Sequence, residues 1–154
     1  MPTDTLKPAK HGRDHHPGGE DPMNLAAVLF IKVTSDLAAS ASVATGDGQF
    51  VFEVSKDMDG LTLTEVETYV TTVSSSGKPT IQLRKIRAGF GDNDILSTKC
   101  EIDANEKNSK DAAIQPVINA TYDDVLWGDH IAIDVDIAGT GAKGLGVILT
   151  FRLP

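Results

Sequence analysis

The stretch His130-Ile131-Ala132-Ile133-Asp134-Val135-Asp136-Ile137 decides the fold class of this chain. Isoleucine or valine stands at every second position, with histidine, alanine or aspartate between them. A period of two is typical of a β-strand that packs one face on a core and turns the other to solvent. Leu145, Val147, Leu149 and Phe151 repeat the pattern farther along. Both segments are therefore predicted to be strands, and the aspartates of the first are expected on its solvated face.

Shorter runs of the same kind precede these two strands. Strands are expected around residues 28–33, 49–54, 66–72, from 81, 95–102 and 116–119. Turns are expected at 45–48, 57–60, 74–79 and 89–94, and one short helical turn within 105–113. About eight short strands divided by turns are typical of sandwiches and barrels. We expect an all-β domain over residues 26–154, a β-sandwich of the jelly-roll type.

Composition limits the kinds of partner. The chain has 154 residues, 40% of them hydrophobic and 5% aromatic, which predicts one domain with a core of valine, isoleucine and leucine. The net charge of -8 argues against binding to nucleic acid or anionic membranes. Residues 1–24 lack the apolar run of a signal peptide, so synthesis and folding in a cytoplasm are expected. The single cysteine, Cys100, excludes an intrachain disulfide and is expected to be partly buried in a strand.

Residues 1–25 have a different character and predict an extended arm. The segment 11–22 contains no apolar side chain other than proline, so it cannot form a core of its own. Prolines remove backbone donors and disfavour both helix and central strand. Such a segment is either a disordered tail or an arm that gains order by docking on another surface, where its cations can pair with acidic groups and its glycines allow tight turns. The predicted anchoring residues are Lys7, Lys10, His11, Arg13, Asp14, His15, His16, Pro17, Gly18, Gly19 and Pro22.

The histidines raise the questions of metal binding and catalysis. His11, His15 and His16, with Asp14, have the ligand chemistry for zinc, iron or nickel. A single arm would lose much entropy on forming such a site, whereas several arms meeting on a symmetry axis would form it more readily. The favoured interpretation is ordinary hydrogen bonding, without metal or cofactor. His130 is the sole histidine of the predicted domain and is expected at its surface, so no nucleophile has an evident base and no enzyme is predicted.

Two motifs resemble ligand-binding loops but lack the neighbours that those loops require. Residues 139–144 match the dinucleotide fingerprint, yet an alternating strand pattern follows where that fingerprint needs a helix. A glycine-rich hairpin turn between the last two strands is expected instead. Residues 57–60 resemble part of a calcium loop, but Val66 stands where that loop needs a bidentate glutamate. A simple turn is expected there.

The arm carries the most specific resemblance in the chain. Its sequence Lys10-His-Gly-Arg-Asp-His-His-Pro-Gly-Gly-Glu-Asp-Pro22 resembles the His-x-x-x-His-x-Pro-Gly-Gly-x-Asp-Pro segments of structural proteins from tailed bacteriophages, fibres included. The body is similar to small phage virion proteins at Ile95-Leu-Ser-Thr98, Ile102-Asp-Ala-Asn-Glu106, 128–136 and 139–151. These motifs consist of turns and strands and include no catalytic signature.

The resemblance implies a subunit of a phage virion, a capsid decoration or head-fibre protein. Its partners would be a phage capsid or tail protein and further copies of itself, as a homotrimer, at the virion surface after assembly in the host cytoplasm. The alternative is a tail or neck component, or an adhesin, that binds host surface glycans. Trp127 is then the candidate ligand contact, because glycan sites present aromatic faces, although the favoured interpretation of this side chain is a partly buried residue at the rim of the domain. A free-standing binding module or enzyme remains a third possibility, and it predicts that loss of the arm leaves function intact.

Overall fold

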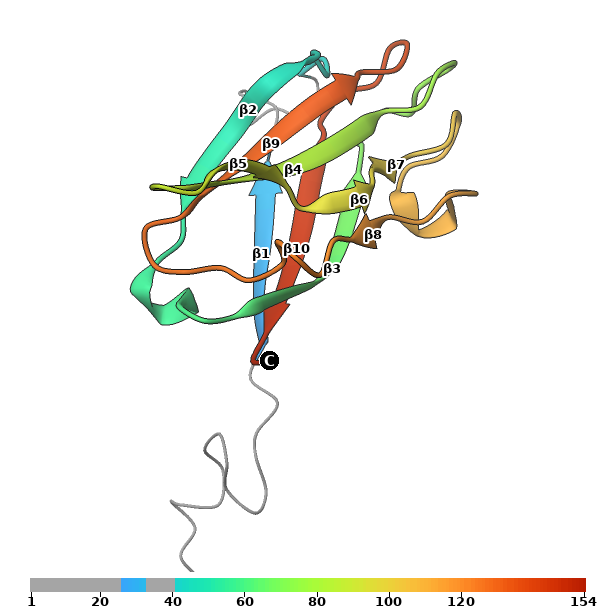
Figure 1. The fold of residues 1–154 in the computed structure, drawn as a ribbon. Helices are drawn as coiled ribbons and strands as arrows, with labels where there is room; N and C mark the ends of the chain where they lie inside the picture. Colours follow the sequence, from blue (N-terminus) through green and yellow to red (C-terminus); the bar gives the residue numbers. More distant parts are fainter. Residues whose placement is uncertain (1–25, 33–40) are drawn as a thin grey trace, which may run out of the picture.

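The computed structural model describes residues 26–32 and 41–154, and within them the pairing of strands is antiparallel throughout (Figure 1). The strands are β1 (Ala26–Lys32), β2 (Gly46–Glu53), β3 (Thr62–Tyr69), β4 (Thr80–Arg87), β5 (Gly91–Asp94), β6 (Leu96–Thr98), β7 (Cys100–Glu101), β8 (Val117–Ile118), β9 (His130–Ile137) and β10 (Gly146–Arg152). Two short 3₁₀ helices, η1 (Lys56–Met58) and η2 (Ser109–Asp111), lie between them. The prediction of an all-β domain is confirmed, while the predicted arm lies outside the described residues.

The strands form two larger sheets and one small one. The first sheet has the order β1-β10-β3, and the second has the order β2-β9-β4-β5 with β7 paired to β4. The third consists of β6 and β8. From β1 to β4 the chain alternates between the two larger sheets, and β9 and β10 also lie in different sheets. The long connections therefore cross between sheets and do not form hairpins within one sheet.

Both larger sheets contribute to one hydrophobic core. The alternating pattern turns Val147, Leu149 and Phe151 of β10 inward, and each is at most 1% exposed. From the other sheet, Ile81 and Leu83 of β4 and several β9 residues join the same cluster. Its other members include Ile131, Ile133, Val135, Val54, Leu63, Val66, Val70, Ile95, Ile102, Val125 and Leu145. Cys100, expected to be partly buried, is fully buried within this cluster.

The predicted solvated face of β9 is wrong at Asp134. That carboxylate is only 6% exposed, while Asp136 is exposed as expected. Arg84 donates to Asp134 from Nε at 3.0 Å, and the Gly48 amide donates to it at 2.5 Å. The register of β2 against β9 shifts between Gly46 and Phe50, so the predicted turn at 45–48 is an irregularity within a strand. This irregular segment brings Gly48 to Asp134 and helps to bury it.

The glycine-rich segment 139–144 is not the predicted hairpin turn, because the strands that it joins lie in different sheets. It is fixed instead to the loop before β4: the Ser75 amide donates to the Thr140 carbonyl, and the Thr140 amide donates to Ser76, both at 2.9 Å. Gly139 has a φ of 72°, and a Cβ there would overlap the Ser74 side chain. Glycine is therefore required at this position by conformation and by space.

Of the other local predictions, two are corrected and two are confirmed. The loop expected at 89–94 contains β5, and the single strand expected at 95–102 is split into β6 and β7. The turn at 57–60 and the helical turn within 105–113 are confirmed by η1 and η2.

The outer face of the first sheet contains one close aromatic contact. Gly146 of β10 lies opposite Tyr69 of β3, and a Cβ on Gly146 would overlap the Tyr69 ring. The ring therefore covers backbone that glycine leaves open, which is a recognised way to stabilise glycine in a sheet.

Candidate functional site in the loop at residues 121–129

The loop at residues 121–129, here called the aromatic loop, joins β8 to β9 and carries both Tyr122 and the predicted ligand contact Trp127. The Trp127 side chain is 62% exposed, and its neighbour Leu126 is 42% exposed. His130, at the start of β9, is exposed as predicted. The predicted anchoring residues and the candidate metal ligands His11, His15 and His16 lie outside the described residues. The structure thus places one predicted site residue, Trp127, on a surface open to a ligand.

An ion pair fixes the end of the aromatic loop to β4. Arg87 donates to Asp129 from Nε to Oδ1 at 2.8 Å and from Nη2 to Oδ2 at 2.6 Å. The Leu126 amide donates to the same carboxylate at 2.8 Å. Burial alone would raise the pKa of the Asp129 carboxyl, but these hydrogen bonds outweigh burial and hold that pKa below its usual range. Asp129 therefore stays ionised while only 3% exposed.

The backbone of Trp127 is held by hydrogen bonds, whereas its ring is exposed. Its amide donates to Asp59 Oδ1 at 2.9 Å, and the following amide, of Gly128, donates to the Val54 carbonyl at 3.1 Å. Lys56 Nζ lies 5.7 Å from the centre of the indole ring. Such an exposed cation–π contact contributes only about 0.5–1 kcal/mol. A fixed backbone with an exposed ring reduces the entropy lost when a ligand stacks on that ring.

A buried lysine supports the other half of the aromatic loop. Lys85 continues the inward-facing series of β4 and is 3% exposed. Its Nζ donates to both Oδ1 and the carbonyl of Asp124, each at 2.7 Å. Burial raises the pKa of Asp124, but the hydrogen bonds from Lys85 and Arg87 outweigh it and lower that pKa. Because its Nζ is held by two hydrogen bonds to Asp124, Lys85 is suited to support the loop.

A pocket of about 300 Å³ opens beside these charges. Its lining comprises Lys85, Arg87, Phe90, Asn93, Thr121, Tyr122 and Asp124. Phe90, in the turn before β5, is 77% exposed. Hydroxyl, amide and carboxylate groups beside aromatic rings suit a polyhydroxylated ligand such as a sugar, which offers both hydroxyl groups and an apolar ring face. Sequence reasoning missed this pocket, although a lysine in the inward series of a strand is a signal that could have drawn attention to β4.

Three further features of the described residues concern metal binding, nucleophilic chemistry and membranes. Within residues 41–154, no group of three or more histidine, cysteine, aspartate and glutamate side chains is placed to hold a metal ion. Burial raises the pKa of the Cys100 thiol, which disfavours the thiolate form that a nucleophile needs. No helix among the described elements is long and apolar enough to cross a membrane.

Comparisons with known proteins give no assignment: no family model, no curated protein and no solved structure matches this chain.

Proposed function

We propose that this chain is a structural subunit of a bacteriophage virion, a capsid decoration or head-fibre protein that docks by residues 1–25. The observation that carries the proposal is the register of β1 on β10, in which Ala26 pairs with Arg152. The arm therefore joins the domain at one end of the first sheet. An attachment at one end leaves the other surfaces of the domain free for display, as decoration of a particle requires.

We further infer that the domain is a jelly-roll sandwich. Two sheets that share one core are the basis of a sandwich. β10 lies between β1 and β3, and β9 lies between β2 and β4. Late strands inserted between early ones, with the chain alternating between sheets, are the pattern of Greek-key connections, and two of them make a jelly roll.

The role proposed for the arm follows from its composition and its resemblance to phage proteins. Lys7, Lys10 and Arg13 would pair with acidic groups of a capsid protein, and the segment 14–22 would follow the docking surface. A homotrimer would cover exposed sheet edges and add the affinities of three arms. The proposed role is not catalytic, involves neither nucleic acid nor membrane, and places the protein on the virion surface after assembly in the host cytoplasm.

The test is incorporation into particles. A variant that lacks residues 1–25 should keep the far-UV circular dichroism of the full chain but should not copurify with virions. A full-length variant with Lys7, Lys10 and Arg13 changed to glutamate provides the matched control for charge, and it should bind particles more weakly. Normal incorporation of the shortened variant, with its fold intact, would exclude the arm as the anchor.

The exposed Trp127 and, separately, the pocket lined by Tyr122 and Phe90 favour a second candidate function. In this alternative, the chain is a tail or neck component, or an adhesin, and the aromatic loop binds host surface glycans. Immunogold labelling of intact virions with an antibody against residues 27–154 distinguishes the two locations. Label over the head supports decoration, and label on the tail supports the alternative.

A further inference from the structure

The free edge of β3 is covered at its two ends and open between them. At one end the Leu63 amide donates to the Asp123 carbonyl at 2.8 Å. At the other end the Thr68 amide donates to Ser109 Oγ at 2.9 Å. The chain from Ser109 to Asp123 thus meets the strand at both ends of this edge.

Val66 presents unpaired backbone in the open part. Amides of a strand point to alternate sides, so the Val66 amide points to the same side as that of Thr68, away from β10. In the described part of the chain, no partner is found for the Val66 amide on that side. An unpaired edge amide and carbonyl are a template for another extended segment.

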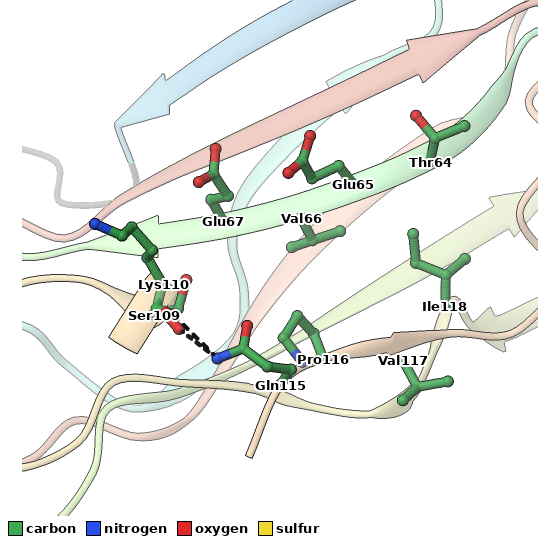
Figure 2. A pocket seen from close by; sticks show the side chains of 10 residues that line it. All are labelled: Thr64, Glu65, Val66, Glu67, Ser109, Lys110, Gln115, Pro116, Val117 and Ile118. Carbon is green, nitrogen blue, oxygen red and sulfur yellow. Dashed lines mark hydrogen bonds between the residues drawn. The ribbon is translucent and has the colours of Figure 1, made fainter. Parts of the chain in front are cut away.

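A groove of about 460 Å³ lies along this open edge (Figure 2). Thr64, Glu65, Val66 and Glu67 of β3 form one wall, and Ser109, Lys110, Gln115, Pro116, Val117 and Ile118 complete the lining. Figure 2 shows Glu65 and Glu67 pointing to the same side of β3, and Val66 to the opposite side. The groove therefore suits a short extended segment that has a small side chain beside Val66 and a cation beside the glutamates.

We propose that, before the protein docks on a particle, Pro8-Ala9-Lys10 of the chain's own arm adds to β3 in this groove, with Ala9 opposite Val66. Ala9 would exchange both backbone hydrogen bonds with Val66 and direct its small side chain inward. Lys10 would lie opposite Glu65 on the outer side, while Pro8, which has no amide hydrogen, would direct its nitrogen away from β3. Outside the described residues, the cations of the chain are Lys7, Lys10 and Arg13, so the arm is the part with matching charge.

The point at which the arm joins the domain agrees with this register. Ala26 pairs with Arg152, which pairs in turn with Thr62, so the arm starts at the Thr62 end of β3, two strands away. That separation is about 10 Å across the sheet. Residues 11–25 reach up to about 50 Å when extended, which is ample. Because the chain must leave the groove toward Thr62, Lys10 lies beside Glu65, and the added segment runs antiparallel to β3. A tethered segment also has an effective concentration of about millimolar, which favours the chain's own arm over a free partner.

Disulfide trapping in the full-length protein tests this register without any virion. Opposite residues of an antiparallel pair have Cβ atoms about 4.5–5.5 Å apart, whereas diagonal neighbours are about 7–8 Å apart. A disulfide needs about 3.5–4.5 Å. The double variant Lys10→Cys with Glu65→Cys should therefore oxidise within one chain at least about fivefold faster than Lys10→Cys with Glu67→Cys. The native Cys100 is buried and does not compete.

Each outcome is decisive. An intramolecular disulfide that favours position 65 supports the proposal. Disulfide-linked dimers would assign the groove to a second copy, and equal or absent oxidation would show that the arm does not lie there, so either result overturns it. Amide exchange gives a second readout. Ala9→Pro removes the Ala9 amide that would donate to the Val66 carbonyl, which weakens the docking of the whole segment. The Val66 amide, which would donate to the carbonyl of residue 9, should then exchange at least about tenfold faster than in the control Thr3→Pro. An unchanged rate would also overturn the proposal, while virion incorporation would still be open to its own test.

Discussion

Asp129→Asn is the most direct test of what holds the aromatic loop. The asparagine keeps the size of the side chain but loses the charge that accepts two hydrogen bonds from Arg87 and one from the Leu126 amide. Breaking a buried ion pair costs about 3–5 kcal/mol. The lower end of this range applies, because the Arg87 side chain is 19% exposed and should still form its 2.8 Å ion pair with Asp124 in the variant. A loss of about 3 kcal/mol corresponds to a fall in Tm of about 6–12 °C for a domain of this size.

The assay is urea unfolding followed both by far-UV circular dichroism and by the fluorescence of Trp127, the only tryptophan in the sequence. Asp57→Asn is the matched control, because this aspartate is exposed and its replacement should change stability by less than about 0.5 kcal/mol. If Asp129→Asn were no more destabilising than this control, the ion pair would not be what holds the loop to β4.

Three further predictions follow from contacts described above. Gly146→Ala should displace the Tyr69 ring and cost about 1–3 kcal/mol in a thermal melt, and Tyr69→Ala in the same chain should recover part of that loss. The pKa values of Asp124 and Asp129 are lower in the folded than in the unfolded chain, so their contribution to the free energy of unfolding should be complete above about pH 4 and should decline as the pH falls below it. Asp129→Asn should flatten that decline, and an unchanged slope would contradict the contribution assigned to Asp129. Trp127→Ala should leave the urea midpoint nearly unchanged, since the ring is 62% exposed, but should abolish any binding on a glycan array; binding that survives the substitution would remove Trp127 from the site.

The period of two was sufficient to predict β9 and β10, because these strands turn a continuous apolar face to one core. It could not predict that Asp134 is buried, since the groups that bury it, Gly48 and Arg84, are distant in the sequence. The hairpin predicted at 139–144 was wrong for a related reason. Adjacent strands are most often neighbours, and only the pairing of β10 with β1 and β3 shows that this chain crosses to the other sheet.

The site was predictable only in part. Trp127 could be selected because several of the other aromatic residues fall on apolar strand faces. Its exposure of 62% was not predicted, since a partly buried rim residue was the favoured interpretation. Its fixed backbone depends on Asp59 and on the ion pair of Asp129 with Arg87, which come from separate parts of the chain. The sequence feature that came closest to indicating the pocket was Lys85, because it occupies an inward position of the strand after Ile81 and Leu83.

The central place of β10 in the first sheet has a consequence for biosynthesis. β10 follows every other described strand in sequence, yet it is the strand that joins β1 to β3. While the ribosome is still making the chain, β1 and β3 have no common partner, and their hydrogen-bonding edges stay open until β10 emerges. Pairings between such distant segments form slowly, on the scale of milliseconds to seconds. Nascent chains are therefore most exposed to aggregation just before synthesis of this domain is complete.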